Sequence, residues 1–115
     1  MIGDRVIIGD KFTWKPESGI TVMAYMPKTD STGNVDIAPD GSVAVVGAGG
    51  VKVGSAGTIH GAIINVHRTY LHDAKDYAKG MGTDMVQLIP VFLDTYQRVG
   101  YFPTDYLRLV GSFAN

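Results

Sequence analysis

Three imidazole side chains, at His60, His67 and His72, are the first candidates for chemistry in this sequence. Because strand residues seven apart alternate onto opposite faces, His60 and His67 are not expected to share a site on one strand. His67 and His72 lie near Asp73 and Asp76, and such a set of side chains is able to bind a metal ion. Solvated polar side chains on an exposed loop account for the same set. We therefore expect no metal site and no cofactor.

Nucleophilic catalysis has little support in the serines and none in cysteine, because the chain contains no Cys. The serines lie in glycine-rich or turn-rich contexts, and none sits in a Gly-x-Ser-x-Gly elbow. Ser55, in Gly54-Ser55-Ala56-Gly57, comes closest but has no strand–turn–helix context. Paired carboxylates such as Asp30 with Asp36 lie in polar segments where solvation is the ordinary explanation. We expect no catalytic residues, and the chain is not expected to be an enzyme.

The run Gly47-Ala48-Gly49-Gly50 invites comparison with phosphate-binding loops. A dinucleotide fingerprint needs a strand, spaced glycines and then a helix whose N-terminus holds the pyrophosphate. Here Val51-Lys52-Val53 follows, which is strand-like, and no Gly-Lys-Ser/Thr is present. The run is therefore interpreted as a glycine-rich connector or a bulge.

Length and composition limit the possible classes of protein further. With 115 residues the chain has the length of one domain, 1–115, and its 45% hydrophobic and 18% charged residues favour folding over disorder. A net charge of −1 supplies no general attraction for nucleic acid, which makes a nucleic-acid partner unlikely. No segment approaches the ~20 apolar residues that cross a bilayer, and no signal peptide precedes the domain. We expect cytoplasmic synthesis and no membrane association.

The elements that must position these residues follow the pattern of an all-β barrel or sandwich. Turn residues recur about every 8–15 residues between β-branched runs. Val35–Ala38 is also a possible short strand, and Pro39-Asp40-Gly41-Ser42 predicts a turn from which Ser42–Val46 pairs back as a hairpin. Helical spacing in Tyr70–Lys79 predicts one short helix inside an insertion, 69–83, and 27–57 is expected to be a long loop. Strands are predicted at 5–8 as an N-terminal β extension, and at 20–26, 58–68 with a bend at Gly61, 84–92, 98–102 and 107–110.

The only specific signal lies at Gly100–Val110, whose sequence is GYFPTDYLRLV. It resembles the end of a Src-homology-3 domain, where a hairpin leads into Gly-aromatic-apolar-Pro-x-x-Tyr and a final strand. The resemblance implies a small barrel with its core at about 20–26 and 58–111. It also implies one 3₁₀ turn at Thr104–Tyr106 and Phe102 in the core, with Pro103 and Tyr106 on the surface. Leu107 and Leu109 are then expected to re-enter the barrel on one face.

Peptide-binding members of that family hold proline-rich segments between aromatic ridges. Tyr25, in Val22-Met23-Ala24-Tyr25, is the remnant expected of the first such ridge. Asp84-Met85 stands where those members carry the Trp that begins the central strand. A groove for a peptide or a cell-wall fragment near Tyr25, Tyr101, Pro103 and Tyr106 is therefore the alternative hypothesis.

The leading hypothesis is a non-catalytic module for protein–protein interaction and assembly. A small barrel with long, weakly charged loops is similar to subunits of large complexes, such as head–tail connector, neck or tail components of a phage virion. The partners are expected to be proteins, either copies of this chain or components of a larger assembly. The strand 85–92, apolar on both faces, supplies contact area. The side chains expected to bind a partner or ligand are Tyr25, Tyr96, Tyr101, Pro103 and Tyr106.

Overall fold

A computed structural model describes residues 2–9, 19–72 and 84–112, and these residues form an antiparallel β fold. The prediction of an all-β chain is confirmed. Two 3₁₀ turns, η2 (Arg68–Tyr70) and η3 (Thr104–Tyr106), interrupt the strands. The strands are β1 (Asp4–Ile8), β2 (Thr21–Pro27), β3 (Val45–Lys52), β4 (Ala56–Ile59), β5 (Ile64–His67), β6 (Met85–Leu93), β7 (Arg98–Pro103) and β8 (Leu107–Ser112).

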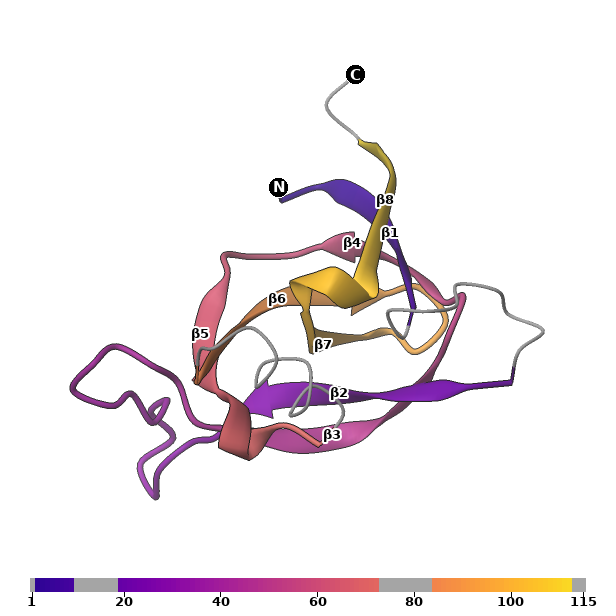
Figure 1. The fold of residues 1–115 in the computed structure, drawn as a ribbon. Helices are drawn as coiled ribbons and strands as arrows, with labels where there is room; N and C mark the ends of the chain where they lie inside the picture. Colours follow the sequence, from indigo (N-terminus) through magenta and orange to yellow (C-terminus); the bar gives the residue numbers. More distant parts are fainter. Residues whose placement is uncertain (1, 10–18, 73–83, 113–115) are drawn as a thin grey trace.

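One open sheet contains all eight of these strands, in the order β3-β2-β7-β6-β4-β1-β8, with β5 also paired to β6. The sheet curls, so that β4 and the β2–β3 hairpin face each other across the interior (Figure 1). Side chains from both ends of the sheet order meet in one cluster: Val6 and Ile8 come from β1, and Val22 and Val51 come from β2 and β3. A flat sheet could not bring these residues together, and the shared core is what bends it.

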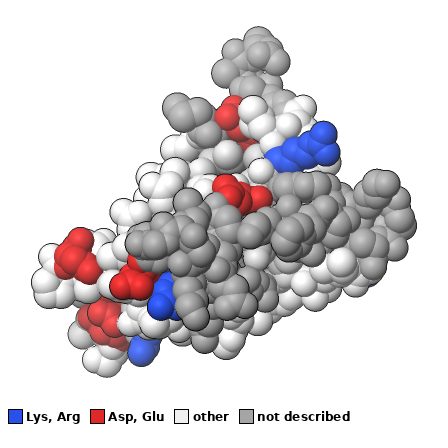
Figure 2. Space-filling view, viewed as in Figure 1, with Lys and Arg blue, Asp and Glu red and all other residues white. Residues whose placement is uncertain are grey.

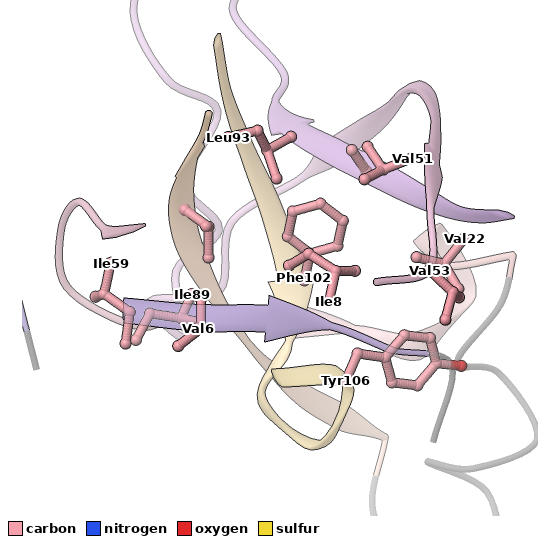
Figure 3. Close-up of a cluster of buried hydrophobic side chains, with 12 residues drawn as sticks. Val6, Ile8, Val22, Val51, Val53, Ile59, Ile89, Leu93, Phe102 and Tyr106 are labelled. Atoms are coloured by element: carbon pink, nitrogen blue, oxygen red, sulfur yellow. The ribbon is translucent and has the colours of Figure 1, made fainter. Parts of the chain in front are cut away.

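The main core surrounds the ring of Phe102, which is fully buried at the centre of the cluster (Figure 3). Alternation on β1 buries Val6 and Ile8 and leaves Arg5 and Ile7 partly exposed, as expected for a strand with one face on the core. The remaining buried members are Val22, Ala24, Val51, Val53, Ile59, Ile89, Val91, Leu93 and Tyr106.

β1 is an integral strand, so the prediction of an N-terminal extension is wrong. It pairs with β4 through Arg5↔Thr58 and with β8 through Ile8↔Leu107. The Arg5 guanidinium also donates to Thr58 Oγ1 (2.8 Å) and Asp94 Oδ1 (2.9 Å), and to the second Asp94 oxygen. These bonds tie β1 to β4 and to the turn after β6, and the bonds from Arg5 to Asp94 lower the pKa of the Asp94 carboxyl.

The glycine-rich run is strand rather than connector, so the expected long loop over 27–57 is wrong in its second half. β3 spans the run, and β4 begins at Ala56. The register moves from Met23↔Gly50 to Tyr25↔Gly47, so β3 holds one residue more than β2 between these pairs. The alternative interpretation of the run as a bulge is thereby supported.

The middle of the chain follows the prediction in outline. The run 58–68 divides at the expected bend at Gly61 into β4 and β5. The 39–42 turn is present, and Ile37 pairs with Val43 across it through an isolated bridge. Thr29↔Val35 is a second isolated bridge in the preceding segment. From Val45 onward the chain is β3, which pairs with β2. The predicted helix at 70–79 lies mostly outside the described residues.

The C-terminal segment confirms the expected hairpin, 3₁₀ turn, core Phe102 and last strand, while its surface positions differ from the prediction. Pro103 is fully buried and Tyr106 is buried, so placing them on the barrel surface was wrong. Leu107 is half-buried, but Leu109 is 64% exposed, although its cross-strand neighbour Val6 is buried. Leu109 lies on the edge strand, and within the described residues no further strand covers it.

The close approach of β4 to its paired neighbour β6 leads to a prediction for Gly57→Ala. An added Cβ would lie 2.5 Å from Val91 Cγ1 and 2.6 Å from the Phe92 carbonyl oxygen, so backbone must move. We expect a loss of about 1–3 kcal/mol in the free energy of unfolding, measured by urea denaturation. Gly50→Ala is the matched control, because its Cβ meets only the Thr21 side chain at 3.6 Å. Equal stability of the two variants would contradict this close approach of β4 to β6.

Candidate interaction surface

Tyr25 is completely buried, so it cannot form an exposed ridge. Its ring lies in a second core cluster with Val45 on β3, Val66 on β5 and Leu88 on β6. The phenol oxygen accepts a hydrogen bond from the backbone N–H of His72 (2.7 Å). Tyr25 therefore anchors the chain just beyond η2 to the sheet, which is a structural task.

Tyr96 and Tyr101 are half-buried, and both are engaged inside the fold. The Tyr96 hydroxyl accepts from the backbone N–H of Lys52 (2.9 Å), and its ring lies 5.7 Å from the guanidinium carbon of Arg98. Arg98 in turn donates to the Ala48 carbonyl oxygen. Tyr101 pairs with Tyr25 across the β2–β7 bridge and packs on the second cluster. Both side chains thus help to position the β2–β3 hairpin.

Pro103 and Tyr106 complete the predicted set, and both are buried. Tyr106 joins the main core, and its backbone carbonyl accepts from the N–H of Gly9 (2.7 Å). The five predicted residues consequently do not line one exposed groove. Tyr25 and Tyr101 are the two that the fold brings into direct pairing, and that pairing is internal.

Asp40, Ser42 and His67 form a polar cluster that the sequence analysis did not assemble. Asp40 Oδ1 accepts from the backbone N–H of Ser42 (2.9 Å) and from its hydroxyl (2.6 Å). Asp40 Oδ2 lies 3.1 Å from His67 Nε2, and since a carboxylate only accepts, that nitrogen carries the hydrogen. The hydrogen bond from the Ser42 hydroxyl has the largest effect, followed by the bonds from the Ser42 N–H and from His67. Together they lower the pKa of Asp40 to about 2.

The order of that cluster does not suit nucleophilic catalysis. In a catalytic triad the imidazole lies between the hydroxyl and the carboxylate, so that it can take the proton. Here the carboxylate lies in the middle, and its low pKa makes it a poor base. Ser42 is itself buried. The cluster instead fixes the turn at 39–42 and joins it to the end of β5.

The remaining imidazoles, His60 and His72, lie apart from any metal-binding group among the described residues. His60 is exposed, with its ring centroid 6.3 Å from that of Phe92. His72 is also exposed, and Asp73 and Asp76 lie outside the described residues. Within residues 2–9, 19–72 and 84–112, no three acidic, His or Cys side chains are grouped closely enough to hold a metal ion. The same residues include no helix with the length and apolar character needed to cross a bilayer.

Residues 28–44, here called the arm, form the longest described segment outside the eight strands and project to one side of the sheet (Figure 1). Backbone bonds order the arm internally: Lys28 N–H donates to the Ala44 carbonyl (2.8 Å), and Asp36 N–H donates to that of Lys28 (2.9 Å). Asp30 Oδ1 accepts from the backbone N–H groups of Thr32 (2.9 Å) and Asn34 (3.0 Å), which fixes the first turn. This part of the expected long loop is thus a folded double hairpin, whose second half forms around the turn predicted at 39–42.

The surface of the arm combines aliphatic and acidic side chains. Val35 and Ile37 are 43% and 61% exposed and, two residues apart in extended chain, lie on the same face. Asp30, Asp36 and Asp40 are all exposed, against one basic residue, Lys28. Figure 2 shows red side chains gathered at the end of the molecule where Figure 1 places the arm. The base of the arm is anchored by Val43, whose N–H donates to the Asn65 carbonyl (2.8 Å).

Comparison of the chain with protein-family models, with curated proteins and with solved structures finds no match. The geometry of the described residues is therefore the basis for a functional assignment. The sequence did contain a signal for the arm, because Asp-x-Thr-x-Asn at 30–34 and Pro-Asp-Gly-Ser at 39–42 are both turn formers.

The buried Tyr25 hydroxyl leads to a prediction for Tyr25→Phe. The substitution keeps the ring but leaves the His72 N–H without this acceptor, which should cost about 1–3 kcal/mol of unfolding free energy. Urea denaturation of the full chain measures the effect. Tyr70→Phe is the matched control, because Tyr70 is 43% exposed and the loss of its hydroxyl should change the free energy of unfolding by less than about 0.5 kcal/mol. Unchanged stability in Tyr25→Phe would show that the hydrogen bond from the His72 N–H to Tyr25 does not stabilise the fold.

The low pKa of Asp40 leads to a prediction about pH. Its folded pKa of about 2 lies below the ~3.9 of an unfolded aspartate, so its carboxylate stabilises the fold fully above about pH 4. That contribution is lost as the pH falls toward 2. The urea midpoint of wild type should exceed that of Asp40→Asn near neutrality, and the difference should shrink across this window. Asp36→Asn is the matched control, because it replaces an exposed aspartate of the same segment that makes none of the Ser42 and His67 bonds of Asp40. An equal, pH-dependent difference in both variants would contradict the assignment of the effect to Asp40.

Proposed function

We propose that the chain is a non-catalytic assembly module, a small structural subunit that binds protein partners within a larger complex. The arm is the contact surface, and the observation that carries the proposal is that it is ordered before any partner binds. Two isolated bridges and two aspartate-centred turns hold Val35 and Ile37 outward in a fixed geometry.

This ordering matters energetically. Fixing a flexible loop on binding costs on the order of 1–2 kcal/mol of conformational free energy per residue. A preorganised arm avoids most of that cost, so burial of two exposed aliphatic side chains can contribute to affinity. The acidic side chains around them favour a basic partner surface and increase the rate of encounter.

We propose further that the fold is a Src-homology-3-like barrel. Support comes from the C-terminal third, in which the β6–β7 hairpin leads through η3 into the last strand, the order that the resemblance implies. Pairing of β8 with β1 joins the strands nearest the two ends of the chain, and the curled sheet encloses the main core. The peptide-groove alternative lacks such support, since Tyr25, Pro103 and Tyr106 are buried. The predicted virion setting stays a prediction.

A charge-insertion variant tests the arm. The tagged chain is co-expressed with the products of the genes that flank its own, and stable co-purification is expected for the wild type. The double variant Val35→Asp, Ile37→Asp should weaken that binding at least about tenfold, because it removes apolar contact and adds charge. Binding is measured by surface plasmon resonance against the co-purified partner.

The matched control is Ile63→Asp, which adds a charge at a residue of similar exposure, 45%, between β4 and β5. It should leave binding unchanged. Equal weakening by both variants, or none by the arm variant, would contradict the arm as the contact surface. Circular dichroism confirms that each variant keeps the β fold.

A further inference from the structure

The turn at 39–42 contains a dipeptide with a chemistry of its own. Asp40-Gly41 is the one Asp-Gly step in the chain, and both residues are exposed to solvent. An Asp-Gly step rearranges more readily than other aspartyl steps, because glycine has no side chain to hinder attack by its own amide nitrogen on the preceding carboxyl group. The turn is therefore a candidate site of spontaneous backbone modification on the arm.

The rearrangement needs water and no other reactant. The Gly41 nitrogen bonds to Asp40 Cγ, and one carboxyl oxygen leaves as water, which carries away the amide hydrogen and the acid hydrogen. The product is a cyclic succinimide. Addition of water then opens the ring in one of two ways. Breaking the bond from Cγ to nitrogen restores aspartate, and breaking the bond from the Asp40 carbonyl carbon to nitrogen leaves isoaspartate, whose main chain runs through Cβ and Cγ.

The folded arm disfavours the acid form of Asp40, from which the oxygen leaves as water. The two carboxylate oxygens accept hydrogen bonds from Ser42 Oγ (2.6 Å), Ser42 N–H (2.9 Å) and His67 Nε2 (3.1 Å). Donors of this kind stabilise the carboxylate over the acid, in agreement with the Asp40 pKa of about 2. Ser42 is itself buried, so solvent competes little for its hydroxyl.

Hydrogen bonds also hold the two reacting atoms in place. Oδ1 is bonded to Ser42 and Oδ2 to His67, so rotation of the carboxyl group about the Cα–Cβ bond would break these contacts. The Gly41 N–H donates to the Ala38 carbonyl oxygen (2.9 Å), which closes the turn. Attack by that nitrogen would break this bond too, because the nitrogen loses its hydrogen in the reaction.

We propose that Asp40-Gly41 is a site of succinimide formation and backbone isomerisation, and that the Ser42–Asp40–His67 cluster protects it in the folded arm. The proposal gives the cluster a task beyond ordering the turn, and it does not depend on which partner the arm binds. Isoaspartate at position 40 would lengthen the main chain of the turn and displace the carboxyl group from Ser42. The Ile37↔Val43 bridge across the turn would then lose its register.

Peptide mapping by mass spectrometry measures isoaspartate at position 40 after incubation of the full chain at constant pH and temperature. The wild type unfolded in guanidinium chloride, which removes the cluster, should convert much faster than the folded wild type. Ser42→Ala removes the hydroxyl bond and keeps the N–H bond, and it should raise the folded rate about tenfold. His67→Phe removes the bond to Oδ2 and should raise the rate by a smaller factor.

Two controls separate local protection from global unfolding. Ser55→Ala removes a hydroxyl bond of the same length, to the Lys52 carbonyl oxygen (2.6 Å), outside the arm, and should leave the rate unchanged. Gly57→Ala strains the sheet and leaves the cluster intact, so it should also leave the rate unchanged. Circular dichroism confirms that each variant keeps the β fold.

Each outcome decides a different part of the proposal. A folded wild type that converts as fast as the unfolded chain, or Ser42→Ala that converts no faster than the wild type, overturns the protection. An unfolded chain that forms no isoaspartate at position 40 overturns the site itself. Equal acceleration by Gly57→Ala assigns the reaction to global unfolding and overturns the protection as well. Loss of partner binding is tested separately by the arm double variant, so failure of the proposed function is distinguishable from failure of this inference.

Discussion

The structure depends on the burial of β1 between β4 and β8, because this strand completes the core from its far side. Val6 and Ile8 reach the same cluster as Val22 and Val51, which come from the opposite end of the sheet. Without β1, the main core would lose one wall, and β8 would lose the one strand that pairs with it among the described residues. The Arg5 bonds to Asp94 and Thr58 hold that strand in register, and they lie at the surface where solvent weakens them. Apolar burial therefore supplies the stability, and the ion pair supplies the alignment.

Curling a sheet around so small a core brings the backbone of some strands close to side chains and backbone of the neighbouring strand. At Gly57 there is no room for a Cβ beside Val91, and at Gly100 an added Cβ would lie 3.0 Å from that of Ala24. Gly49, at a positive φ of 99°, lies beneath the Arg98 guanidinium. Several of the glycines that make the sequence look loop-rich are thus positions of tight packing, which explains why 45–52 is a strand despite three glycines.

Local signals predicted the elements well and their exposure poorly. Turn residues and β-branched runs located the strands around 20–26, 84–92 and 98–102, and Pro103 with Tyr106 located η3. Burial of Tyr106 and Pro103, however, depends on contacts with β1 and β6, from distant parts of the sequence. The Asp40–His67 contact likewise joins residues 27 positions apart. A single sequence shows spacing along the chain, and it does not show which distant strand will cover a given side chain.

The burial of most of the aromatic residues discussed above explains why the arm and β8 present aliphatic side chains. Tyr25, Phe102 and Tyr106 fill the two cores, and Tyr96 and Tyr101 brace the β2–β3 hairpin, so these side chains are engaged within the fold. The exposed apolar residues Val35 and Ile37 lie on the arm, and Leu109 and Val110 lie on β8, well apart in the fold (Figure 1). Because two bridges and two aspartate-centred turns already fix the arm, its aliphatic side chains can be buried by a partner without the cost of ordering a flexible loop.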